Sequence, residues 1–428
     1  MRLHFAFLVS ISSALASFGF VSAFGADPLP RAKPEQVGMS SERLGRIGEA
    51  LRADVEKGRL PGAVVAVARK GKLVYYQSFG YLDKDAGTKM HNDAIFSIAS
   101  MTKPIVAVGA LTLLERGQLA IDEPVGTYLP PLSKMQVAVL KSNDGGPGFD
   151  TVAAQRQVTI QDLMRHTSGI IYGGRGATAV HKLYPASSSA VGSGMTGKEF
   201  VDKLASLPLL HQPGSTWDYG FGLDVLGVVI ERVSGQPLGQ YLEAQVFKPL
   251  GMKDTAFAVP PEKAKRYAKA LANDPDTGKP QFVLDLTKPL KLECGGGCAA
   301  STAGDYLRFA QMLLDGGKLE GKRILSRKTV EYMLSNQLAP NTVNLIANAD
   351  PTSADMGFGL GVAVRTTPGV VRKVGSVGEF SWNGAYGTSW WADPKEGLAV
   401  VFMAQTPGPI RWHYRYVINA LVEQAIVD

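Results

Sequence analysis

The 428-residue sequence has little of what metal-binding and disulfide-rich proteins need. It contains two cysteines and six histidines, and it has no His-Glu-x-x-His motif. The zinc-protease signature is therefore excluded, because that site needs two histidines one helical turn apart with a glutamate between them. Cys294 and Cys298 enclose three glycines and have no histidine nearby, which argues against a zinc ribbon. They form either a disulfide or two free thiols, and we expect neither a metal nor a cofactor.

Two other catalytic signatures are missing or incomplete. The sequence has no Gly-x-Ser-x-Gly, so it lacks the nucleophile elbow of α/β-hydrolases. Residues 192–198 have the spacing of a phosphate-binding loop, but Glu199 stands where a hydroxyl ligand is required. We interpret them as a loop that leads into a helix. The net charge of +7 is spread along the chain without a basic run interleaved with aromatics, so we expect no nucleic-acid partner.

Long hydrophobic runs are absent after the first residues. Residues 5–20 are apolar and uncharged, Arg2 precedes them, and Val21-Ser22-Ala23 offers small residues for cleavage. This pattern predicts a signal peptide over residues 1–23 and a periplasmic or secreted protein. A buried first helix and a membrane anchor are the alternatives. No later stretch is apolar enough to span a bilayer, so we expect no membrane span after signal removal.

Hydrophobic periodicity predicts helices and strands in a particular order. Helix patterns cover 41–56, 100–116, 302–315, 329–336 and 410–427, and strand patterns cover 62–68, 73–81, 358–364, 387–391 and 398–404. Between them, residues 159–164, 197–207, 223–233 and 238–247 are helix candidates, and the strand signal is weak. This order predicts a discontinuous α/β domain, residues 24–118 and 301–428, with a mostly helical domain inserted at 119–300.

The strongest chemical signal is Ser100-Met101-Thr102-Lys103 at the start of a predicted helix. Residues three apart lie on one face of a helix, so the amine can approach the hydroxyl. A serine hydroxyl is a weak nucleophile until a neighbouring base takes its proton. The flanking residues are apolar or small, which predicts a buried Lys103. By itself the spacing is also that of a helix-capping serine followed by a surface lysine.

Further motifs resolve this ambiguity through a resemblance. The segment 96–103 resembles the serine motif of class C β-lactamases and of the related family VIII carboxylesterases. In chain order, 163–169 resembles the His-Thr-Ser-Gly segment of that superfamily, Trp217-Asp218-Tyr219 its tyrosine motif, and 301–306 a segment of its later helix. The resemblance covers nearly the whole mature chain. It implies a β-lactamase-like α/β (α+β) fold, an antiparallel sheet flanked by helices with an inserted helical domain.

The resemblance also implies roles for individual residues. Ser100 would be the acylated nucleophile, and Lys103 and Tyr219 would share the role of general base. The backbone N–H groups of Ser100 and Ala385 would form the oxyanion hole, which stabilises the charge of the tetrahedral intermediate. His166 is interpreted as a structural residue that anchors its loop, because no acidic residue is placed to form a triad with it.

The sequence departs from the β-lactamase pattern at two substrate contacts. Trp382-Asn383-Gly384 stands where β-lactamases carry Lys-Thr-Gly, and a Trp-x-Gly is typical of family VIII esterases. Phe221 replaces an asparagine that binds the amide side chain of the drug. We therefore expect Trp382, Asn383, Gly384 and Phe221 to form a pocket for neutral, apolar acyl groups.

The leading hypothesis is a serine carboxylesterase that hydrolyses small, short-chain carboxylic esters through an acyl-Ser100 intermediate, with weak cephalosporin hydrolysis as a secondary activity. A class C-like β-lactamase, a DD-peptidase and an acyltransferase would use the same machinery. A catalytically silent binding protein is a more distant alternative, and the presence together of Ser100, Lys103 and Tyr219 argues against it.

Overall fold

The computed structural model describes residues 27–141 and 148–428. The segment expected to be a signal peptide, residues 1–23, lies outside the described residues. The strands of the main sheet come from both ends of the chain and pair antiparallel in the order β12-β13-β14-β15-β16-β1-β2-β3. The expected antiparallel fold class is confirmed.

The centre of the sheet joins the two ends of the chain. β1 (Gly62–Arg69) and β2 (Lys72–Asp83), at the two strands expected at 62–68 and 73–81, form a hairpin, and β1 pairs along its length with β16 (Leu398–Ala404). All eight residues of β1 and all seven of β16 are buried. Such continuous burial requires cover on both faces of the sheet, unlike an antiparallel sheet with one face in water.

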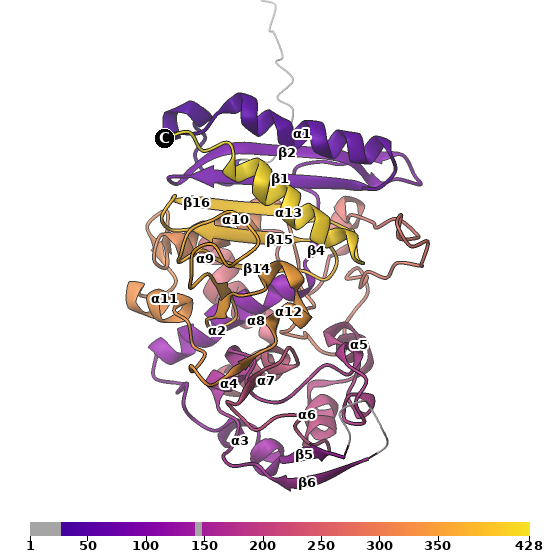
Figure 1. Cartoon of the computed structure of the whole chain (residues 1–428), viewed down its shortest axis with the longest axis vertical. Helices are drawn as coiled ribbons and strands as arrows, with labels where there is room; N and C mark the ends of the chain where they lie inside the picture. Colours follow the sequence, from indigo (N-terminus) through magenta and orange to yellow (C-terminus); the bar gives the residue numbers. More distant parts are fainter. Residues whose placement is uncertain (1–26, 142–147) are drawn as a thin grey trace, which may run out of the picture.

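Helices provide that cover (Figure 1). α1 (Ser41–Glu56) and α13 (Ile410–Glu423) pack on one face, where their apolar residues join a core with alternate residues of β1 and β16. α10 (Ala303–Leu314) packs against β1, β15 (Ser389–Asp393) and β16 on the other face. α2 (Thr102–Glu115) lies between this half and the helices below, and all its residues through Leu113 are buried. The charge on any side chain of α2 that points inward therefore needs a partner within the protein.

Most of the remaining elements are short. The main sheet is completed by β3 (Thr88–Lys89), β12 (Gly357–Phe358), β13 (Ala363–Val364) and β14 (Phe380–Asn383). The other helices are α3 (Val125–Tyr128), α4 (Ile160–Met164), α5 (Ser188–Gly194), α6 (Gly197–Ala205), α7 (Gly222–Ser234), α8 (Leu238–Leu242), α9 (Lys248–Leu250), α11 (Arg327–Leu334) and α12 (Ile346–Ala349). Small two-stranded pairs are β4 (Phe96–Ser97) with β8 (Ala300–Ser301), β5 (Gln136–Leu140) with β6 (Phe149–Ala153), β7 (Thr216–Trp217) with β11 (Val343–Asn344), and β9 (Lys318–Leu319) with β10 (Lys322–Arg323).

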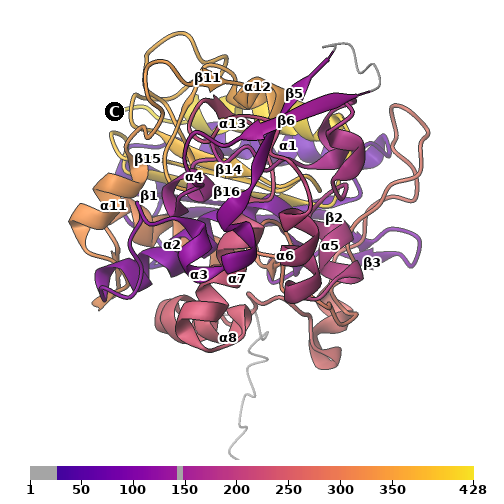
Figure 2. The ribbon, with the colours of Figure 1, turned by 90° about the horizontal axis from the view of Figure 1, so that it is seen from below.

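Two sequence expectations need correction. Loops and turns make up most of the described part of 119–300, and its regular structure is mainly helical, but it also carries the β5–β6 hairpin, which extends from the helices in Figure 2. The single strand expected at 358–364 is the turn of a hairpin, in which Phe358 pairs with Ala363 and Gly361 has φ of +82°. The run is apolar throughout, so its periodicity did not reveal the turn. The domain boundaries at 118/119 and 300/301 stay a prediction.

Among residues 27–141 and 148–428, none of the helices combines the length and the apolar character that crossing a membrane requires.

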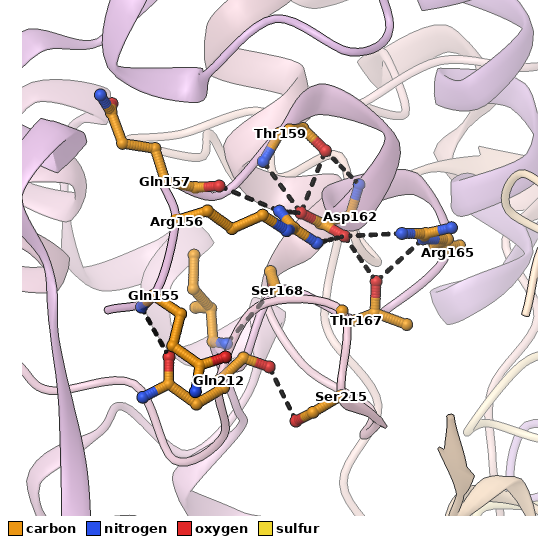
Figure 3. A network of polar contacts seen from close by, with 12 residues as sticks. Gln155, Arg156, Gln157, Thr159, Asp162, Arg165, Thr167, Ser168, Gln212 and Ser215 are labelled. Atoms are coloured by element: carbon orange, nitrogen blue, oxygen red, sulfur yellow. Dashed lines mark hydrogen bonds and ion pairs between the residues drawn. The ribbon is translucent and has the colours of Figure 1, made fainter. Parts of the chain in front are cut away.

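A buried carboxylate fixes the loop that leads from α4 toward the centre of the molecule (Figure 3). Asp162 has no exposed surface and forms ion pairs with Arg156 and Arg165, the latter at 3.0 Å. It also accepts hydrogen bonds from Thr159 and from the Thr167 hydroxyl, at 3.0 and 2.8 Å. Burial alone would raise the pKa of Asp162, but these donors hold it below its usual value. Asp162 thereby ties α4 to the His-Thr-Ser-Gly segment that follows.

We predict that Asp162→Asn lowers the free energy of unfolding at pH 7 by about 3–5 kcal/mol, because it breaks a buried ion pair. A carboxylate with a lowered pKa stabilises the fold above its unfolded pKa of about 4, and this contribution is lost as the pH falls through the native pKa. The difference between wild type and variant, measured by urea unfolding, should therefore shrink below about pH 4.

Asp202→Asn is the matched control, because Asp202 pairs with Lys198 on the surface of α6. It should change the free energy of unfolding by less than about 1 kcal/mol. An Asp162→Asn effect as small as this, or one independent of pH, would show that the network does not stabilise the loop.

Candidate active site

Ser100 lies in the turn that joins β4 to α2. Residues Ala99–Met101 form one tight helical turn, and α2 begins at Thr102. Ala99 has φ of +44°, in the left-handed region, which costs a residue with a side chain about 1–3 kcal/mol. Such strain persists only where the surrounding structure imposes it, and here it directly precedes Ser100, which is half-buried.

Lys103, one helical turn further on, has no exposed surface. Its Nζ lies 3.4 Å from Ser100 Oγ and donates to the Tyr172 hydroxyl at 3.2 Å. It also donates to the Gly296 carbonyl at 2.5 Å, and it lies 4.4 Å from the ring centroid of Tyr219. An amine can be buried when acceptors and an aromatic face replace its water. Lys103 therefore faces the nucleophile from inside the protein.

The carboxyl group of Asp224 on α7 is linked to this amine through one intervening hydroxyl, that of Tyr172. Asp224 is fully buried and accepts from the Tyr172 hydroxyl and the Ser188 hydroxyl, each at 3.0 Å. Burial raises the pKa of the Asp224 carboxyl, and the charge of Lys103 opposes that rise. Burial also raises the pKa of Tyr172 well above its usual value, so its hydroxyl keeps its proton and links Lys103 to Asp224.

Tyr219 is buried beside the same amine, and its hydroxyl accepts a hydrogen bond from Trp382 Nε1 at 3.2 Å. Its ring lies near two cationic side chains, Lys103 and the exposed Arg175, whose guanidinium carbon is 5.3 Å from the ring centroid. The Trp382 and Tyr219 rings pack together with centroids 5.4 Å apart. The structure thus brings Ser100, Lys103, Tyr219 and Trp382 into one site.

The turn after β14 carries the second expected oxyanion-hole donor. The Gly384 N–H donates to the Thr388 carbonyl at 2.8 Å, and the Thr388 hydroxyl donates to the Ile98 carbonyl at 3.2 Å, two residues before Ser100. A Cβ on Gly384 would lie 2.6 Å from the Ile98 carbonyl oxygen, so only glycine permits this approach. Within residues 27–141 and 148–428, the Ala385 N–H has no hydrogen-bond acceptor.

One buried ion pair, Arg415 with Asp350, supports this turn. Arg415 of α13 donates to the Gly384 carbonyl at 2.7 Å and to Asp350 at 2.9 Å, and Asn383 also donates to Asp350. Burial would raise the pKa of Asp350, but the charge of Arg415 holds it below its usual value. Asn383 is therefore engaged by Asp350 in this structure, and its amide supports the turn.

His166 does not meet the requirements of a catalytic base. It is 1% exposed, has φ of +57°, and packs against the rings of Trp217, Tyr219 and Phe358. Burial and the nearby charges of Lys103 and Arg175 lower its pKa well below the usual value, so it stays neutral. Among the described residues no carboxylate pairs with it. A buried, neutral side chain packed among aromatic rings is consistent with a structural role for His166.

Comparison with known proteins places this arrangement in a family. A family model described as Beta-lactamase matches residues 47–420. The chain belongs to the beta-lactamase family. Esterase EstB of Burkholderia gladioli is 33% identical over 360 residues, which cover 81% of this chain and 86% of that protein. Protein Rv1367c of Mycobacterium tuberculosis (strain ATCC 25618 / H37Rv) is 37% identical over 362 residues, covering 83% and 88%.

A solved structure gives the same result. The structure of "EstCE1, a hydrolase with promiscuous acyltransferase activity" superposes with a TM-score of 0.73 at 26% identity, covering 89% of this chain and 98% of that chain. The expected relation to family VIII esterases and class C β-lactamases is confirmed, and the chain is an esterase-type serine hydrolase on the β-lactamase fold.

Two polar residues of this beta-lactamase-family site were missed by the sequence reasoning. Tyr172 follows the apolar pair Ile170-Ile171, and nothing in its spacing predicts contact with Lys103. Asp224 did carry a signal, because a carboxylate within the apolar helix 222–230 needs a buried partner. In the described residues no group of three or more histidine, cysteine or acidic side chains could hold a metal ion.

Phe221 differs from its expected role. Its side chain has no exposed surface and packs between the rings of Tyr172 and Phe200, at centroid distances of 4.4 and 5.3 Å. It supports the ring of Tyr172 and has no surface that a substrate can reach. The apolar character that suggested a pocket wall is that of a core residue.

We predict that Lys103→Ala and Tyr219→Phe each lower kcat for ester hydrolysis by about 10³-fold. The double variant should be little worse than either single variant, because two groups that move one proton together are not additive. Steady-state rates with 4-nitrophenyl butyrate measure this. Tyr184→Phe is the control, because Tyr184 is a buried tyrosine that hydrogen-bonds the Pro208 carbonyl away from Lys103. Losses that multiply would show that the two groups act independently.

Proposed function

We propose that this chain is a serine carboxylesterase that hydrolyses small, short-chain carboxylic esters through an acyl-Ser100 intermediate. The observation that carries the proposal is the buried Lys103 amine, 3.4 Å from the hydroxyl of Ser100. A lysine without exposed surface beside a half-buried serine at a strained turn is suited to activating an alcohol.

The proposed reaction has two steps. Ser100 Oγ attacks the ester carbonyl carbon while its proton passes to the Lys103–Tyr219 pair, and the N–H groups of Ser100 and Ala385 stabilise the oxyanion. The C–O bond to the alcohol then breaks, and the alcohol leaves with the proton. In the second step water attacks the acyl carbon and gives a proton to the same pair. The bond between the acyl carbon and Ser100 Oγ then breaks, Ser100 Oγ takes that proton from the pair, and the acid leaves.

The choice of ester over β-lactam is supported by Trp382. A lysine at this point of the strand would offer a charge to the carboxylate of a β-lactam, worth about 1.5–3 kcal/mol. Trp382 carries no charge, its side chain is only 3% exposed, and its N–H is already used by Tyr219. The missing contact corresponds to roughly 10–150-fold in kcat/KM.

We predict a higher kcat/KM for 4-nitrophenyl butyrate than for a chromogenic cephalosporin, whose slow turnover at Ser100 is the proposed secondary activity. Trp382→Ala should lower ester hydrolysis, because it removes the hydrogen bond and the ring packing that hold Tyr219. Trp390→Ala is the matched control. Trp390 pairs with Trp382 across the sheet but packs against Tyr306 and Phe309.

The control should lower thermal stability and leave the ratio of the two substrates unchanged. Faster hydrolysis of the cephalosporin than of the ester by the wild type would replace the esterase proposal with that of a β-lactamase.

Acyl transfer is the second candidate, supported by the likeness to EstCE1, which is described as a hydrolase with promiscuous acyltransferase activity. An alcohol would then take the place of water in the second step. Adding butanol to a reaction with 4-nitrophenyl butyrate should yield butyl butyrate, detected by gas chromatography, and its absence would exclude this activity.

We also propose export to the periplasm or the medium, supported by the leader pattern of residues 1–23 and by the disulfide described below. Sequencing of the exported protein should give Phe24 as its first residue or a start slightly later. An exported protein that begins at Met1 would exclude cleavage.

A further inference from the structure

The loop from Cys294 to Cys298 crosses the buried side of the active site. The carbonyl of Gly296 accepts from Lys103 Nζ at 2.5 Å, and its N–H donates to Asp224 Oδ1 at 2.9 Å. The shortest hydrogen bond of Lys103 is therefore made to this loop and not to a side chain. The position of one backbone carbonyl fixes where the amine lies relative to Ser100.

Two of the three glycines of this loop, Gly295 and Gly296, are required by close approach. A Cβ on Gly296 would lie 2.1 Å from an oxygen of Asp224, and one on Gly295 would lie 2.4 Å from the Leu223 carbonyl oxygen. Neither distance is tolerable, so a side chain at position 295 or 296 would push the loop away from the Lys103 amine. Glycine, however, has more conformational freedom than any other residue, and a run of three does not hold a fixed shape by itself.

A disulfide between Cys294 and Cys298 restrains this run. Both cysteines are fully buried, and their Cα atoms are 5.2 Å apart. The N–H groups of Gly297 and Cys298 both donate to the Cys294 carbonyl at 3.1 Å, which closes the loop into a turn. Gly192 of α5 packs on the bridge, because a Cβ there would lie 2.8 and 3.1 Å from the two sulfurs. The sequence allowed either a disulfide or two free thiols, and the structure has the Cys294–Cys298 disulfide.

We propose that the Cys294–Cys298 disulfide is a positioning element of the active site, which holds the Gly296 carbonyl against Lys103 so that the amine faces Ser100. The inference rests on the proposed acyl-Ser100 chemistry. When the bridge is opened, the three glycines gain freedom, the carbonyl leaves the amine, and Lys103 loses its alignment with Ser100. Acylation then slows although the fold persists.

Dithiothreitol opens the bridge by a balanced exchange. One of its thiolates attacks a cysteine sulfur and forms a mixed disulfide, which its second thiol resolves. The protein disulfide takes up two electrons and two protons and becomes two thiols, and dithiothreitol becomes its cyclic disulfide.

The test compares the oxidised wild type with Cys294→Ala/Cys298→Ala and with wild type reduced by dithiothreitol, all as full mature chains. Two rates are measured: single-turnover acylation by 4-nitrophenyl butyrate, and labelling of Ser100 by a fluorophosphonate, which needs no knowledge of the natural ester. A displacement of the amine by about 1 Å should slow both rates by about 10- to 100-fold. KM should change little, because the loop lies on the inner side of Lys103. Reoxidation of the reduced wild type should restore both rates.

Two further variants separate positioning from stability. Leu292→Ala removes a buried side chain two residues before the bridge and should lower Tm while leaving both rates unchanged. In a Lys103→Ala background, removing the disulfide should cause no further loss of labelling rate, because the bridge acts through that amine.

Equal rates in oxidised wild type, reduced wild type and double variant would overturn the proposal, as would an additional loss in the Lys103→Ala background. If the double variant does not fold, the reduced wild type decides the question below its Tm. A wild type that labels at Ser100 but hydrolyses no ester would refute the proposed function and leave this inference standing.

Discussion

The burial of one lysine amine organises this protein. Lys103 lies on a helix that is buried on all sides, so every interaction that water would have given its amine must come from the chain. The Gly296 carbonyl, the Tyr172 hydroxyl and the ring of Tyr219 supply them, and Asp224 supplies the nearest opposite charge through Tyr172. A buried polar network stabilises only when it is fully satisfied. This explains why segments from four parts of the chain converge at one amine.

The main sheet and the Arg415–Asp350 ion pair determine which groups lie opposite that amine. β1 pairs with β16, so the ends of the chain hold β14 beside the turn that carries Ser100. Arg415 bridges Asp350 and the Gly384 carbonyl and thereby fixes the Gly384 turn. The strained φ of Ala99 is a consequence of this packing, since strain of that size persists only when the surroundings outweigh it. Stability elsewhere in the fold thus keeps the reactive groups in place.

The sequence pattern predicted correctly those features that depend on residues close together along the chain. The three-residue spacing of Ser100 and Lys103 follows from one turn of helix, and helix 41–56 was predicted with its observed bounds. Tyr172 and Asp224 reach Lys103 only through tertiary packing, which no spacing along the chain encodes. The β5–β6 hairpin was missed although residues 137–140 are apolar, because β6 is mostly exposed and its residues show no alternation of apolar and polar side chains. The role of Phe221 was predicted wrongly because an aromatic side chain suits a pocket wall and a core position equally well.

The central claim is that Lys103 activates Ser100 for acylation, and trapping the acyl-enzyme tests it most directly. A reaction with 4-nitrophenyl butyrate is quenched with acid within its first turnover, digested, and analysed by mass spectrometry. We predict one butyryl group on the peptide that contains Ser100, with its formation severely slowed in Lys103→Ala. A butyryl group on a different residue, or equal acylation of Ser100 without the lysine, would contradict this claim.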